Sequence, residues 1–71
     1  MPKILWVNPN RDEWWVSREG AIGAEAIFDS RDQAIDWACR VAHRRSPCLV
    51  RVRDDRGAVV AQFLFEQAVA A

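Results

Sequence analysis

The side chains of this chain that could do chemistry lie around Cys39, His43 and Cys48. Cysteine and histidine are ligands that zinc prefers, and these three residues stand within ten positions of one another. A closed structural zinc site needs four ligands, however, and the sequence has no second pair at zinc-finger spacing. We therefore expect Cys39 to be a small core residue, and we expect neither a metal ion nor another cofactor.

Nucleophilic and acid–base catalysis find little support in the sequence. His43 is the sole histidine, and no serine stands in the Gly-x-Ser-x-Gly setting of a nucleophile elbow. The carboxylates cluster next to expected turns or on the polar side of an expected helix, where a solvated role explains them better than a catalytic pair. We therefore expect a protein that is not an enzyme and has no small-molecule substrate.

Arginines make the second half of the chain basic. Residues 1–37 carry four cations and seven anions, a net of −3, whereas residues 38–71 carry six cations and three anions, a net of +3. Such an asymmetry can mark an anionic partner, although the chain as a whole is neutral. The candidate DNA-binding residues are the six arginines of the second half: Arg40, Arg44, Arg45, Arg51, Arg53 and Arg56.

Two of these arginines suggest a way of binding. Arg51 and Arg53 should project from one face of a strand, and two such strands in a dimer could form a ribbon that enters the DNA major groove. The alternative is a solvated strand face, together with a helix end whose arginines complement the helix dipole.

Aromatic side chains form a second candidate surface. Trp6 and Trp15 should emerge together on the side of the first hairpin away from the helix, and exposed adjacent tryptophans usually mark an interface. The alternative is that both belong to the core. The last strand is apolar on both faces, so both of its faces could be covered. The candidate interface residues are Trp6, Trp15, Phe63 and Phe65.

The element that must position these side chains is a helix expected over residues 30–45. Ser30 can cap its start, with Gln33 at the spacing of a capping box, and Pro47 ends the run. Small apolar residues recur at helical spacing, so a sheet could approach the helix backbone closely. They are Ala34, Ile35, Ala38, Val41 and Ala42.

Alternating residues and turn signals predict strands on both sides of this helix. The expected strands are 3–8, 13–18, 25–28, 48–53 and 58–65, with turns at 9–12 and 54–57. The fold class is therefore α+β: an antiparallel β-β-β-α-β-β sheet with one helix packed on it.

The length of 71 residues predicts a single domain, with an ordered core over 2–65 and a tail over 66–71. A chain this short buries only about 60% of its unfolded surface, and small scaffolds often need a partner subunit. We expect an intertwined homodimer, since strand exchange would remove unpaired edges. With no signal peptide, no membrane span and only two cysteines, we expect a cytoplasmic protein without a membrane partner.

Four short motifs resemble the DUF2188 family of small bacterial domains. They are Val7-Asn8-Pro9, Trp14-x-Val16, Phe28-x-Ser30-x-x-x-Ala34-Ile35-x-x-Ala38 and Asp55-x-Gly57. The resemblance covers roughly residues 5–65 and implies a small α+β fold. Because the function of that family is undefined, the resemblance implies no catalytic residue. Trp6, Trp15 and Trp37 are additional tryptophans outside its pattern.

From the sequence we predict a cytoplasmic homodimer that acts as a DNA-binding module through the arginines of residues 40–56. The alternative is a protein–protein interaction module that uses Trp6 and Trp15. A small metal-binding protein ranks below both.

Overall fold

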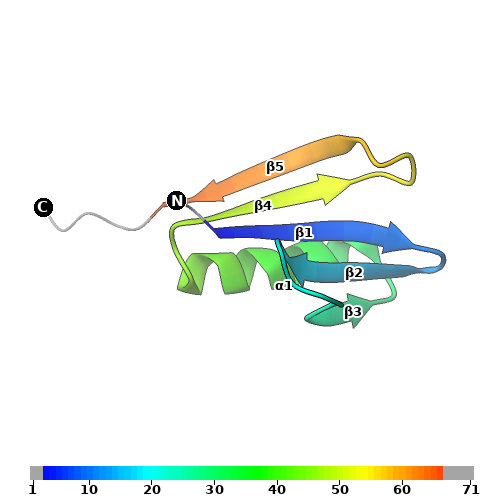
Figure 1. The fold of residues 1–71 in the computed structure, drawn as a ribbon, viewed down its shortest axis with the longest axis horizontal. Coiled ribbons are helices and arrows are strands. Elements are labelled where there is room, and N and C mark those ends of the chain that lie inside the picture. The colour runs from blue at the N-terminus through cyan, green and yellow to red at the C-terminus, as the bar shows by residue number, and fades with distance from the viewer. Residues whose placement is uncertain (1–2, 67–71) are drawn as a thin grey trace, which may run out of the picture.

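One helix packs on a five-stranded sheet in the computed structural model, which describes residues 3–66 (Figure 1). The elements are β1 (Lys3–Asn10), β2 (Glu13–Arg18), β3 (Ala26–Phe28), α1 (Arg31–Arg44), β4 (Cys48–Arg53) and β5 (Val59–Phe65). The predicted α+β fold and its element order are confirmed. Of the expected tail, Glu66 follows β5 outside any strand, and residues 67–71 lie outside the described residues.

The sheet is mixed, so the prediction of a purely antiparallel sheet is wrong. Its strand order is β3-β2-β1-β4-β5, and β1 pairs in parallel with β4 while the other neighbouring pairs are antiparallel. The reason is the helical crossover. Because α1 returns the chain to the end of the sheet where β3 began, β4 must run in the same direction as β3 and β1.

The core lies between α1 and one face of the sheet. Alternate residues of β1, β2 and β4 point toward the helix, and small residues of α1 meet them, which lets the helix lie close to the strands. None of these side chains is more than 8% exposed: Leu5, Val7, Val16, Cys48, Val50 and Val52 from the sheet, and Ala34, Ala38, Val41 and Ala42 from the helix.

The helix begins as the sequence predicts. Ser30 has an extended backbone, and its side-chain oxygen accepts a hydrogen bond from the backbone N–H of Gln33 at 3.2 Å. On the exposed side, Asp36 and Arg40 form the expected ion pair at 3.1 Å. Arg45 is the C-cap, so the predicted span of 30–45 includes both caps.

The first turn is tighter than expected, because β1 continues to Asn10. Asn10 pairs with Glu13, which leaves only Arg11 and Asp12 in the loop, and Arg11 takes a φ of 58°. A proline fits late in β1 because the pairing with β4 ends at Val7, so that Pro9 has a neighbouring strand on one side only.

The turn between β4 and β5 forms as predicted. Gly57 takes a φ of 83°, a conformation that glycine adopts without strain. The carboxylate of Asp54 accepts hydrogen bonds from the backbone N–H groups of Arg56 and Ala58, both at 2.9 Å.

β5 is less covered than its sequence suggests. Of the five strands, β5 makes the fewest contacts with α1, because the helix lies over the middle of the sheet. Four large apolar residues of β5 therefore remain exposed: Val59 at 48%, Val60 at 53%, Phe63 at 39% and Leu64 at 56%. Residues 3–66 of one chain therefore leave both faces of this strand partly uncovered. In the same residues, no helix is long and apolar enough to cross a membrane.

Replacing Ala38 by leucine should test the close contact between helix and sheet. Ala38 is fully buried, and a larger side chain there must push α1 away from the strands, so we expect Ala38→Leu to lower the free energy of unfolding by about 1–3 kcal/mol. Urea denaturation measures this change. The control is Gln33→Leu on the exposed side of α1, where we expect a change within about 0.5 kcal/mol. Equal effects of the two variants would contradict tight packing at Ala38.

Candidate nucleic-acid interface

The face of the sheet opposite α1 has no covering element among residues 3–66, and we call it the open face. It is defined by the residues that alternate with the buried core positions on each strand. They are Ile4, Trp6, Asn8 and Asn10 on β1, Glu13, Trp15 and Ser17 on β2, Ile27 on β3, Leu49, Arg51 and Arg53 on β4, and Val59, Gln62 and Leu64 on β5.

Two arginines flank a tryptophan in the middle of the open face. Trp6 and Arg51 are register partners on the parallel strands β1 and β4. The guanidinium carbon of Arg53 lies 3.8 Å from the centre of the Trp6 ring, and that of Arg51 lies 5.5 Å away. These are cation–π contacts, which orient the guanidinium groups and leave Trp6 half-buried. The N–H donors of a guanidinium radiate in its own plane, so a group held over a ring can still donate at its edges.

No carboxylate neutralises these two arginines within residues 3–66. Arg51 instead donates from Nε to Oε1 of Gln62 at 3.1 Å. By contrast, Arg40 pairs with Asp36 at 3.1 Å, and Arg45 pairs with Glu25 at 3.2 Å. The positive charges of Arg51 and Arg53 are therefore the ones available to an anion on the open face.

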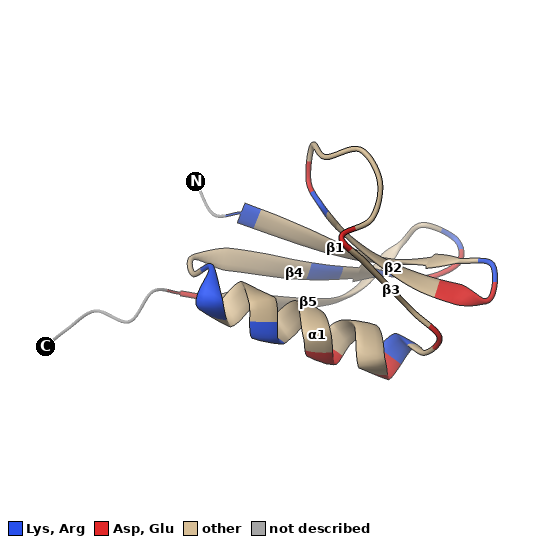
Figure 2. Cartoon of the chain, turned by 90° about the horizontal axis from the view of Figure 1, so that it is seen from below, with Lys and Arg blue, Asp and Glu red and all other residues tan. Residues whose placement is uncertain are grey.

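The structure does not bring the six predicted arginines together. Figure 2 shows basic residues on both α1 and β4. The exposed side of α1 and the open face of the sheet point in opposite directions. Arg40 and Arg44 are exposed on α1, and Arg45 caps the end of that helix. Arg56 stands in the loop between β4 and β5. Only Arg51 and Arg53 share the open face.

The four predicted interface aromatics are divided in the same way. Trp6 lies opposite Ser17 and Trp15 lies opposite Asn8, so the two tryptophans are diagonal neighbours on the open face. Trp15 is half-buried, and its Nε1 donates to Oε1 of Glu13 at 3.3 Å.

The two phenylalanines lie on the helix side of the sheet. Phe63 pairs with Val50 and Phe65 pairs with Cys48, and both partners are core residues. The ring of His43 on α1 meets Phe65 edge-on at 6.4 Å between centroids. Trp6 and Trp15 therefore cannot share one flat interface with Phe63 and Phe65.

Sequence reasoning missed Asn8 as a member of the open face. Its side-chain oxygen is buried and has no hydrogen-bond partner within residues 3–66. Buried acceptors are usually paired, so this oxygen is an exception among the described residues. The signal was present in the sequence, because the alternation that places Trp6 on this face also places Asn8 there.

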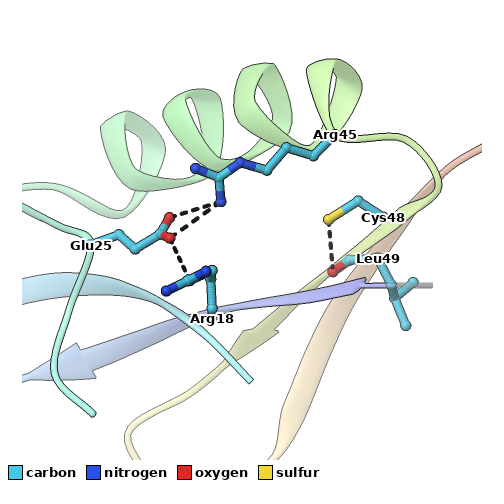
Figure 3. Close-up of polar contacts among 5 residues, drawn as sticks. All are labelled: Arg18, Glu25, Arg45, Cys48 and Leu49. Atoms are coloured by element: carbon cyan, nitrogen blue, oxygen red, sulfur yellow. Dashed lines mark hydrogen bonds and ion pairs between the residues drawn. The ribbon is translucent and has the colours of Figure 1, made fainter. Parts of the chain in front are cut away.

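A cleft of about 490 Å³ at one end of the sheet is a second candidate, and two of its four charged lining residues, Arg18 and Arg45, already form ion pairs. Arg18 and Arg45, which both line the cleft, hold the carboxylate of Glu25 between them, at 2.8 Å from Arg18 and 3.2 Å from Arg45 (Figure 3). Cys48 also lines the cleft; its side chain is fully buried, and burial raises the pKa of its thiol. A buried neutral thiol is a poor nucleophile, so Cys48 does not make this cleft a nucleophilic site.

The cysteines and the histidine do not form a metal site in the described part of the chain. There, no group of three or more histidine, cysteine, aspartate or glutamate side chains is arranged to hold an ion. Cys39 and Cys48 are both free thiols. Burial and the nearby carboxylate of Asp36 raise the pKa of Cys39, which is the opposite of what a metal-binding thiolate needs.

Comparison with known proteins adds a family and no function. A family model described as "Uncharacterized protein conserved in bacteria (DUF2188)" matches residues 5–61 of the 71. Neither a curated protein nor a solved structure matches the chain.

The two thiols should differ in reactivity. Cys39 is partly exposed and Cys48 is fully buried, so we expect an aromatic disulfide reagent at pH 8 to modify one thiol in the native protein and the second only after unfolding. Cys39→Ala should remove the native reaction.

Because the Asp36 charge contributes to the raised pKa of Cys39, Asp36→Asn should lower this pKa and speed the reaction at constant pH. Rapid native modification of both thiols would contradict the burial of Cys48.

Proposed function

We propose that this chain, which belongs to the DUF2188 family, is a non-enzymatic module that binds DNA through the open face. The observation that carries the proposal is the position of Arg51 and Arg53. Both guanidinium groups are oriented by Trp6 on an uncovered sheet face, and neither has a carboxylate partner among the described residues. Oriented, unpaired arginines beside aromatic rings suit phosphates and bases.

The shape of the open face favours single-stranded DNA over a duplex. Five strands at a spacing of about 4.8 Å make a surface roughly 19 Å wide, whereas the major groove of B-DNA is about 12 Å wide. Arg51 and Arg53 lie on β4, inside this sheet rather than on a free two-stranded ribbon. We propose that one strand lies across the face, with Arg51 and Arg53 on its phosphates and a base against Trp15.

We further propose that the module works as a homodimer in the cytoplasm. A chain of 71 residues that leaves much of β5 exposed has a reason to associate. Its two cysteines are free thiols, as expected in a reducing compartment.

A second candidate function is a protein–protein interaction module that uses the same face. It is favoured by Ile27, which is 49% exposed on β3, and by Leu64, which is exposed on β5. These apolar side chains lie at the two margins of the open face, on either side of Trp6 and Trp15. The two candidates differ in their response to salt, because binding to phosphates weakens steeply as salt is added and apolar contact does not.

The Arg51→Ala/Arg53→Ala variant tests the DNA proposal. We expect the wild type to bind a fluorescein-labelled thymidine oligonucleotide of about 12 nucleotides, a length within the range of single-domain sites, more tightly than the matching duplex. The variant should bind at least about tenfold more weakly. Loss of two phosphate contacts should also flatten the slope of log affinity against log salt by about 1.4. Fluorescence anisotropy across a salt series measures both quantities.

The matched control is Arg40→Ala/Arg44→Ala, which removes the same formal charge from α1 and leaves the open face intact. We expect it to keep most of the affinity. If both double variants weaken binding equally, net charge and not the open face governs the contact. If the wild type binds neither oligonucleotide at low salt, the DNA proposal is wrong.

A further inference from the structure

We infer that two copies of this chain pair through β5, edge to edge and antiparallel, so that their sheets join into one. The pairing specifies the contact of the homodimer proposed above, and its test measures mass and cross-linking. It can therefore fail or succeed independently of DNA binding.

The first observation is that β5 is an edge of the sheet that no other element covers within residues 3–66 (Figure 1). Its sequence, Val-Val-Ala-Gln-Phe-Leu-Phe, contains no charged residue and no proline over seven positions. Proteins usually protect such an edge with lysine, proline, a very short strand or a covering element. The opposite edge, β3, is protected by its length of only three residues. The unprotected edge is thus the one prepared to accept another strand.

The second observation is that both faces of β5 are apolar and partly uncovered. Phe63 lies on the helix side and is 39% exposed, whereas Leu64 lies on the open face and is 56% exposed. Exposed apolar side chains alone could bind many kinds of partner. The outer edge of β5 also has free backbone N–H and C=O groups, and the partner that satisfies both features is another strand.

The third observation selects a second β5 as that partner. Pairing of β5 with β3 of another copy would match only three residues, and its head-to-tail repetition would give an open fibre. Antiparallel pairing of β5 with itself closes after two copies. Because the strand carries no charge, no like charges meet across the two-fold axis.

The register follows from the irregularity in the strand. The pairing of β4 with β5 shifts between Val52 and Arg53, which makes Val60 the extra residue of a bulge. The regular part is therefore 61–65, and its centre is Phe63. In the self-paired strand Phe63 faces Phe63 of the second copy, and Ala61 faces Phe65, so a small side chain meets a large one on the helix side.

The mass of the protein in solution tests this pairing. We expect the wild type to have twice its 8.1 kDa chain mass by light scattering at micromolar concentration. Phe63→Lys would set two like charges opposite each other, and we expect it to halve the mass. The control is Ile22→Lys, a substitution at a fully exposed apolar residue in the loop after β2, which should keep the wild-type mass. Circular dichroism checks that each variant is folded.

Cross-linking tests the register without a disruptive charge. In a Cys39→Ala background, Phe63→Cys should form a disulfide between copies under mild oxidation, because residues directly opposite have Cβ atoms about 4.5–5.5 Å apart. Leu64→Cys is the control. Leu64 is more exposed than Phe63, but the two Leu64 side chains would be diagonal neighbours about 7–8 Å apart, too far for a disulfide.

A folded wild type that is monomeric at all concentrations overturns the inference. So does a dimer that keeps its mass in Phe63→Lys, or one in which Leu64→Cys cross-links faster than Phe63→Cys. A wild-type monomer that binds an extended peptide would assign the edge to another protein and would equally overturn pairing with a second copy.

Discussion

The close packing of α1 on the middle of the sheet is the constraint on which the rest of this structure depends. Ala34, Ala38 and Ala42 are fully buried, so the helix lies directly over the valines of β1, β2 and β4. One helix of 14 residues covers only one face, and it reaches β5 only at its margin. The open face and the exposed side chains of β5 are therefore both consequences of the same contact.

Local patterns predicted the elements well, because each rests on neighbouring residues. The Ser30 cap, the Gly57 turn and the alternation in β4 all follow from sequence spacing. The direction of β4 did not follow, because strand pairing depends on where the crossover returns the chain, and the hydrophobic pattern alone did not indicate a parallel neighbour. The length of β1 was also missed, since Pro9 suggested a turn, yet it has a neighbouring strand on only one side and can remain in the strand.

The candidate site was predictable in its parts and not in its assembly. Alternation alone put Arg51 and Arg53 on one side of a strand, and Trp6 on one side of another. Only the parallel register of β1 with β4 makes these residues neighbours, and so turns two separate expectations, an arginine surface and a tryptophan surface, into one. The same geometry removes Arg40, Arg44 and Arg45 from that surface, because a helix and the far face of a sheet cannot meet one flat ligand.

The open face and the β5 edge are linked by geometry. If β5 of one copy pairs with β5 of another, the faces opposite the helices become one continuous surface, because all residues on the same face of a joined sheet stay on that face. The Arg51 and Arg53 pairs of the two copies then lie on one side, separated only by the two β5 strands. A small neutral chain would in this way present four oriented arginines to a single polyanion, which neither its length nor its net charge suggests.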